Sequence, residues 1–201
     1  MLMASSEGST REPIPAGMHH AICYSVYDLG HQYSEQFDKS SHKCVIIWEL
    51  PDERIQIEKD GETKDLPKIT SKQYTLSLHE KANLRKDLES WRGKVFTEAE
   101  LAGFDIHNLI GINCMLQIIH KQRDGKTYAN ISAIVPLMKG MAKKAPENPT
   151  VVYALSDGEP PETTPKWIVE TIRQSDEWKA TVSRQESEEP PPYIPDDDVP
   201  F

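Results

Sequence analysis

The last residues of the chain combine charge, rigidity and an aromatic ring in one short run. They read Asp196-Asp197-Asp198-Val199-Pro200-Phe201. A terminal aromatic side chain gives a docking anchor, proline limits the entropy lost on docking, and three carboxylates accelerate encounter with a basic surface. The pattern predicts a peptide that docks on a partner protein with a basic, phenylalanine-accepting pocket. A solvated acidic tail that promotes solubility is the alternative.

This run closely resembles the terminal motif of bacterial single-stranded DNA-binding proteins, with Val199 standing where isoleucine or leucine is also seen. The resemblance implies that the tail recruits replication, recombination and repair proteins. More faintly, the body is similar to phage- and prophage-type OB-fold single-stranded DNA-binding proteins, in Tyr74–Leu78, Trp91–Thr97 and Leu109–Gly111. That similarity implies an OB-fold over residues 15–140 and a bacterial, phage or prophage origin.

Binding of single-stranded DNA without strong sequence preference needs a basic groove and aromatic platforms, because every base has a π-face. Tyr128 lies beside Lys126 and Lys121 on a predicted hairpin, whose tip carries Arg123. Aromatic residues also surround the first predicted loop, and further basic residues lie on strands or after a helix. The candidate DNA-binding residues are Tyr27, Tyr33, Phe37, Lys43, Lys72, Arg92, Lys94, Lys121, Arg123, Lys126 and Tyr128.

The elements that would position these residues follow the order three strands, helix, two strands. Period-two patterns and β-forming residues predict strands over 17–29, 42–50, 69–78, 112–121 and 127–136, with Pro51 ending the second. Helical spacing predicts a helix over 80–91 that stops at Gly93, and Thr97 is a predicted N-cap. Asp124-Gly125 predicts the last hairpin turn. The order predicts a mainly β protein with a five-stranded OB-like barrel and a helical insertion between the third and fourth strands.

The rest of the chain is predicted to be an arm, an extension and a tail. Residues 1–14 form a flexible arm and residues 141–179 an extension with a short helix over 164–178, where Trp167, Ile168 and Ile172 share one side. Residues 180–201 are proline-rich and acidic, which predicts disorder. Self-association of the chain is left open.

The net charge of −9 comes entirely from the C-terminal part. Residues 1–144 hold 19 basic and 19 acidic residues, whereas residues 145–201 hold 4 basic and 13 acidic ones. A net negative charge argues against a nucleic-acid partner. Because the body is neutral, it can still carry a local basic groove.

Three separated cysteines, Cys23, Cys44 and Cys114, lie within apolar runs, which predicts small core residues in a reducing, cytoplasmic protein. The histidines lack metal-ligand spacing, and no apolar stretch is long enough to span a membrane. We therefore expect no cofactor, no metal and no enzymatic activity. Two other hypotheses stay open: a replication adaptor whose barrel binds protein, and a metal-dependent nuclease.

Overall fold

The computed structural model describes residues 12–59 and 61–188. It divides into two compact units. A sheet unit comprises residues 12–27 and 44–153, and a helical unit comprises residues 28–43 and 154–188. Two long strands, β1 (Gly17–Ser34) and β2 (Lys39–Lys59), run through both units.

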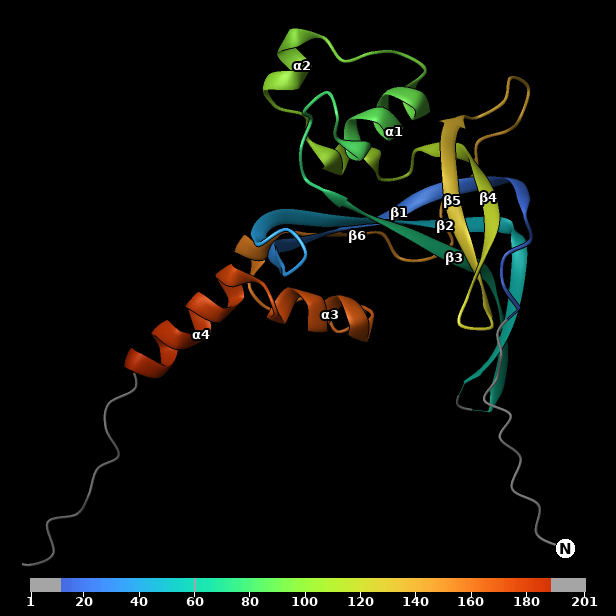
Figure 1. Ribbon diagram of the computed structural model, residues 1–201. Helices are drawn as coiled ribbons and strands as arrows, with labels where there is room; N and C mark the ends of the chain where they lie inside the picture. Colours follow the sequence, from blue (N-terminus) through green and yellow to red (C-terminus); the bar gives the residue numbers. More distant parts are fainter. Residues whose placement is uncertain (1–11, 60, 189–201) are drawn as a thin grey trace, which may run out of the picture. The chain divides into compact units, whose positions relative to one another are not determined.

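The chain is mainly β, and the strands within its described residues form one six-stranded sheet. The main path has the order β3-β2-β1-β4-β5, and the short strand β6 pairs with β1 in parallel (Figure 1). The strands other than β1 and β2 are β3 (Glu62–Thr75), β4 (Asn113–Arg123), β5 (Lys126–Pro136) and β6 (Val151–Tyr153). The sheet is open, with β3 and β5 at the two ends of the path. The mainly β class is therefore confirmed.

The second strand is longer than its sequence predicts, because Pro51 does not end it. From Pro51 to Glu58 half-buried and exposed residues alternate, with Ile55 and Ile57 among the half-buried ones. Proline adopts the extended backbone of a strand and lacks only one hydrogen-bond donor. The charged residues Asp52–Arg54 before the isoleucines obscure this period-two pattern in the sequence.

The core of the sheet unit contains the residues that the apolar runs predict. Cys23, Cys44 and Cys114 are buried free thiols, and burial raises the pKa of Cys23 and Cys114 well above the ordinary thiol value. Cys23 and Cys114 therefore stay protonated at neutral pH, and the burial of all three cysteines confirms their prediction as small core residues. Trp48 is fully buried and packs against Trp91 with ring centroids 5.7 Å apart.

Helix α1 (Asn83–Arg92) packs against the two edge strands of the sheet (Figure 1). The Asp87 carboxylate accepts from Lys72 and Tyr74 on β3, at 2.6 and 2.7 Å. Ser90 Oγ donates to the Ile134 carbonyl on β5 at 2.6 Å. The helix thus packs against both β3 and β5, although these strands are far apart along the sheet path.

The Gly93 end of the first predicted helix and the Thr97 N-cap are present, whereas α1 begins at Asn83 and not at Glu80 as predicted. Gly93 caps α1 in the left-handed conformation, with φ 68°, and its amide donates to the last turn. Thr97 caps α2 (Glu98–Ala102) in a capping box with Glu100. A 3₁₀ turn, η1 (Ile106–Leu109), follows before β4.

An irregular segment over residues 137–150 is fixed to the sheet by two buried polar side chains. Glu49 on β2 accepts from the amides of Glu147 and Asn148 and from Asn148 Nδ2, at 2.7–3.0 Å. Asn113 on β4 accepts from the Lys144 amide and donates to the Lys144 carbonyl. Hydrogen bonds to a buried carboxylate are among the stronger ones, so this segment is held firmly on its way to β6.

The helical unit contains a 3₁₀ turn, η2 (Leu155–Asp157), and two helices, α3 (Lys166–Arg173) and α4 (Asp176–Glu188). Sequence predicts one helix over 164–178, but the chain breaks at the buried Ser175, whose Oγ accepts from the Trp178 amide. Ile168 and Ile172 are buried as expected, whereas Trp167 is 45% exposed. Residues 180–188, which were predicted to be disordered, are helical. No helix within the described ranges is long and apolar enough to cross a membrane.

Candidate nucleic-acid interface

The β4–β5 hairpin carries four of the candidate DNA-binding residues on adjacent positions. Lys121 lies directly opposite Tyr128, and Arg123 lies opposite Lys126. The turn has Asp124 and Gly125 at φ 52° and 72°, which is the geometry that an Asp-Gly hairpin turn adopts. Side chains on opposed positions of a hairpin project from the same face. The hairpin therefore presents three basic groups and one aromatic ring together.

Lys72 joins these residues from the opposite edge of the sheet path. A depression of about 770 Å³, which we call the basic groove, is lined by Ser71, Lys72, Lys121–Asp124 and Tyr128–Ile131. It lies between β3 and the β4–β5 hairpin. Tyr128 is 47% exposed, while the flanking Ala129 and Ile131 pack against the core. The groove is the place where basic and aromatic candidates meet.

The charges in the basic groove are only partly neutralised. Lys72 is paired with Asp87, and its ammonium lies 5.5 Å from the centre of the Tyr74 ring. Burial, and then the negative charge of Asp87, raise the pKa of Tyr74, so its hydroxyl stays a donor. Arg123 and Asp124 lie 3.5 Å apart but are both 84% exposed, where an ion pair contributes little. Lys121 is exposed beside them.

Two other candidates of the sheet unit have structural roles. Tyr27 is 2% exposed and its ring packs against Tyr153, so it offers no face to a base. The Arg92 guanidinium lies 4.4 Å from the Phe96 ring centre and also contacts Glu100. Tyr27 and Arg92 are therefore not part of the candidate interface. Lys94 is exposed in the turn after α1 and is not among the residues that line the basic groove.

The remaining candidates, Tyr33, Phe37 and Lys43, belong to the helical unit. The tight turn between β1 and β2 carries Phe37, which is 72% exposed, and the Tyr33 hydroxyl donates to Asp38 at 2.6 Å. Lys43 is half-buried on β2. Phe37 and Tyr33 are thus exposed aromatic side chains of the helical unit, and none of these three residues lines the basic groove.

Helix α4 forms hydrogen bonds to both strands that flank this turn. The Glu177 carboxylate accepts from both the ring and the backbone amide of His31, and Asp176 accepts from Ser40. The hydrogen bond to Glu177 raises the pKa of His31, and Asp176 and Asp28 add to it. Burial alone would raise the pKa of Glu177, but the His31 hydrogen bonds lower it. The centre of the neighbouring His42 ring lies 4.9 Å from that of His31, and His42 Nε2 donates to the Asp28 carboxylate at 2.6 Å.

These shifts give the helical unit a defined pH dependence. A raised His31 pKa stabilises the fold fully below about 6.5, and this stabilisation is lost as the pH rises through the raised value. A lowered Glu177 pKa stabilises the fold above the ordinary value of 4.5 and is lost as the pH falls. We expect an NMR titration to give a His31 pKa above 6.5, which falls towards the ordinary value in Glu177→Gln. Equal His31 pKa values in both proteins would contradict this contact.

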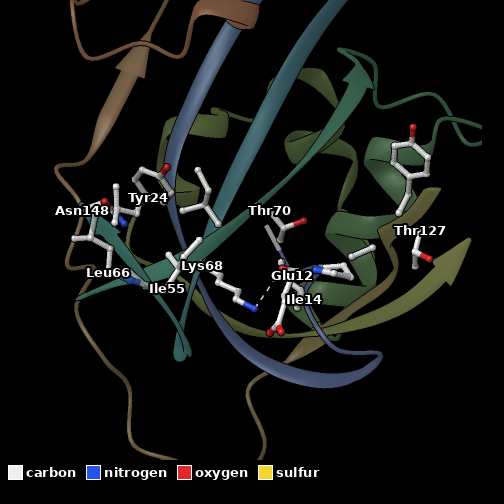
Figure 2. Close-up of a pocket in the computed structure, with 15 residues that line it drawn as sticks. Glu12, Ile14, Tyr24, Ile55, Leu66, Lys68, Thr70, Thr127 and Asn148 are labelled. Carbon is white, nitrogen blue, oxygen red and sulfur yellow. Dashed lines mark hydrogen bonds between the residues drawn. The ribbon is translucent and has the colours of Figure 1, made fainter. Parts of the chain in front are cut away.

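Sequence reasoning missed a pocket next to the basic groove. This pocket, which we call the side pocket, has a volume of about 420 Å³ and apolar walls that include Ile14, Ile55, Ile57 and Leu66. Figure 2 shows Tyr24 and Asn148 at one end, Thr127 at the other and Thr70 between them. Lys68 Nζ donates to the Glu12 carbonyl at its rim. In the sequence, the signal for this pocket is the alternation of Ile55 and Ile57 with polar residues.

Comparisons with known proteins leave the chain without a family assignment. A scan against protein-family models and a search of curated proteins both give no match. Among the residues that the structure describes, no group of three or more His, Cys, Asp or Glu side chains is arranged to hold a metal ion. The predicted docking run Asp196–Phe201 lies outside the described residues.

Proposed function

We propose that the chain binds single-stranded DNA through the basic groove. The observation that carries this proposal is the convergence of Lys72, Lys121 and Arg123 around the exposed ring of Tyr128. Phosphates would lie along the basic side chains, and one base would stack on the tyrosine. In a duplex the bases face inward and are already stacked, so the ring contributes only when the strand is single.

The sheet supports the finer proposal of an OB-fold. In the path β3-β2-β1-β4-β5 the first strand pairs with the second and the fourth, and α1 falls between β3 and β4. The contacts of α1 with both edge strands bring β3 and β5 towards each other. An OB-fold is a partly open five-stranded barrel, and its β4–β5 loop contributes to nucleic-acid binding. In this proposal β6 and residues 137–150 are additions outside the barrel.

Removal of the aromatic platform should weaken binding without changing its salt dependence. We expect Tyr128→Ala to lower the affinity for single-stranded DNA by about 1–3 kcal/mol, because stacking on one base is lost. Tyr128→Phe keeps the ring and should retain most of the affinity. Fluorescence anisotropy of a labelled oligothymidine measures both. Unchanged affinity in Tyr128→Ala would remove this residue from the interface.

The segment Asp196–Phe201 is proposed to recruit other proteins. Its likeness to the tail of bacterial single-stranded DNA-binding proteins supports partners from replication, recombination and repair with a basic, phenylalanine-accepting pocket. A chain that lacks Asp196–Phe201 should bind DNA equally well or slightly more tightly, because a competing polyanion is gone. The same deletion should abolish pull-down of the partner. Loss of DNA binding on this deletion would refute the division of roles.

A further inference from the structure

Stacking of one base on Tyr128 and neutralisation of phosphates in the basic groove do not use the side pocket. We propose that it is a subsite for a second base of the bound strand, turned out of the stack and inserted between β3 and β5. This inference rests on the proposed function, since it needs a strand in the basic groove. It adds a specific position at which the protein contacts a base and not only the backbone.

The walls of the side pocket suit a flat, mainly apolar ring. Ile14, Ile55, Ile57 and Leu66 supply aliphatic surface from three different segments of the chain. A volume of about 420 Å³ falls within the range of small-ligand sites. Ile14 also belongs to the core, and the carbonyl of Ile14 accepts from His120 on β4 at 2.8 Å. This wall is therefore part of the rigid fold.

The polar groups of the side pocket favour a base over a purely apolar side chain. Asn148 lies at one end, where Nδ2 donates to the buried Glu49, so the orientation of its amide is fixed. Burial, followed by the charges of neighbouring groups, raises the pKa of Tyr24 to about 12, so its phenol stays protonated. Thr70 and Thr127 line the middle and the far end. A base edge can hydrogen-bond to such groups, whereas an aliphatic or phenyl ligand would leave them unpaired.

The side pocket adjoins the basic groove, because Tyr128 and Ala129 line both. A ligand that uses both sites must join an apolar ring to a chain of negative charges. A nucleotide strand has this composition: its phosphates would face Lys121 and Arg123 while one base enters the side pocket. An acidic peptide with an aromatic residue shares part of this chemistry, and the experiment below separates the two.

The test compares an oligothymidine with an abasic oligonucleotide of the same length, using the full chain and anisotropy. The ratio of the two affinities reports base contacts, while the abasic affinity reports the groove charges. Thr70→Trp on β3 and Thr127→Trp on β5 should fill the side pocket from opposite walls. Each should lower the ratio by about 30-fold, which is the middle of the range for one base contact, and leave the abasic affinity unchanged. Thr63→Trp, an exposed position on β3 outside both sites, is the matched control.

The outcomes separate this inference from the proposed function. An unchanged ratio in both filling variants would overturn the subsite while DNA binding in the groove stands. No binding of either oligonucleotide by the natural chain would refute the proposed function and the subsite together. If a synthetic Asp196–Phe201 peptide binds the natural chain but not Thr70→Trp, and the ratio stays unchanged, the pocket is a peptide site and the inference is wrong.

Discussion

Replacing Lys121 and Arg123 together with alanine should lower the affinity for single-stranded DNA by about 25-fold at about 0.1 M salt, with the slope of log affinity against log salt falling by about 1.4. Both side chains are exposed in the basic groove, opposite Tyr128 and Lys126. Each phosphate contact on a single strand releases about 0.7 counterions, and the loss at this salt follows from two such contacts. Anisotropy titrations at several salt concentrations measure both quantities.

A double variant at Lys139 and Lys143 provides the matched control. Both are exposed lysines of the sheet unit, and neither lines the basic groove. Their replacement with alanine changes the net charge by the same amount. If the charge of the whole chain and not its position governs binding, the two double variants will lose the same affinity. That result would contradict the groove.

The largest loss of stability is expected from Trp48→Ala, at about 3–5 kcal/mol. Trp48 is fully buried on β2 and packs against Trp91 of α1, so it joins the sheet to the helix that contacts both edge strands. Truncation leaves a cavity that surrounding side chains fill only in part. Urea unfolding followed by circular dichroism gives the change in the free energy of unfolding.

Two further tryptophan variants separate packing from hydrogen bonding. The Trp48 indole nitrogen is buried without a hydrogen-bond partner, so Trp48→Phe removes an unsatisfied donor while keeping a ring in the core. It should destabilise the chain much less than Trp48→Ala. Trp167→Ala, at a 45% exposed position, should have an effect below about 1 kcal/mol. Equal losses in Trp48→Ala and Trp167→Ala would contradict the assigned core.

Local patterns predicted the elements of the sheet unit well where side-chain spacing is regular. The Asp124-Gly125 turn, the Gly93 cap and the Thr97 capping box are all present, because each depends on residues close in the sequence. The start of β1 at Gly17 and the end of β5 at Pro136 also match the prediction. The prediction fails at Pro51, where pairing with neighbouring strands outweighs a local signal for the end of a strand.

The candidate site could be predicted only in part. Parity along β5 placed Tyr128 on the outer face, and the turn placed Arg123 at the tip. Burial depends on contacts between distant segments, so the sequence could not show that Tyr27 packs against Tyr153. For the same reason the side pocket, whose walls come from β1, β2, β3, β5 and two irregular segments, was not predicted.

The central claim is tested most directly by titrating a labelled single-stranded oligothymidine with the chain at low and moderate salt, with unlabelled duplex as the competitor. The proposed function predicts tight binding that weakens steeply as salt rises and is not displaced by duplex. Absence of binding at low salt would contradict it. In that case a replication adaptor, with a barrel that binds protein through contacts barely sensitive to salt, would become the leading hypothesis.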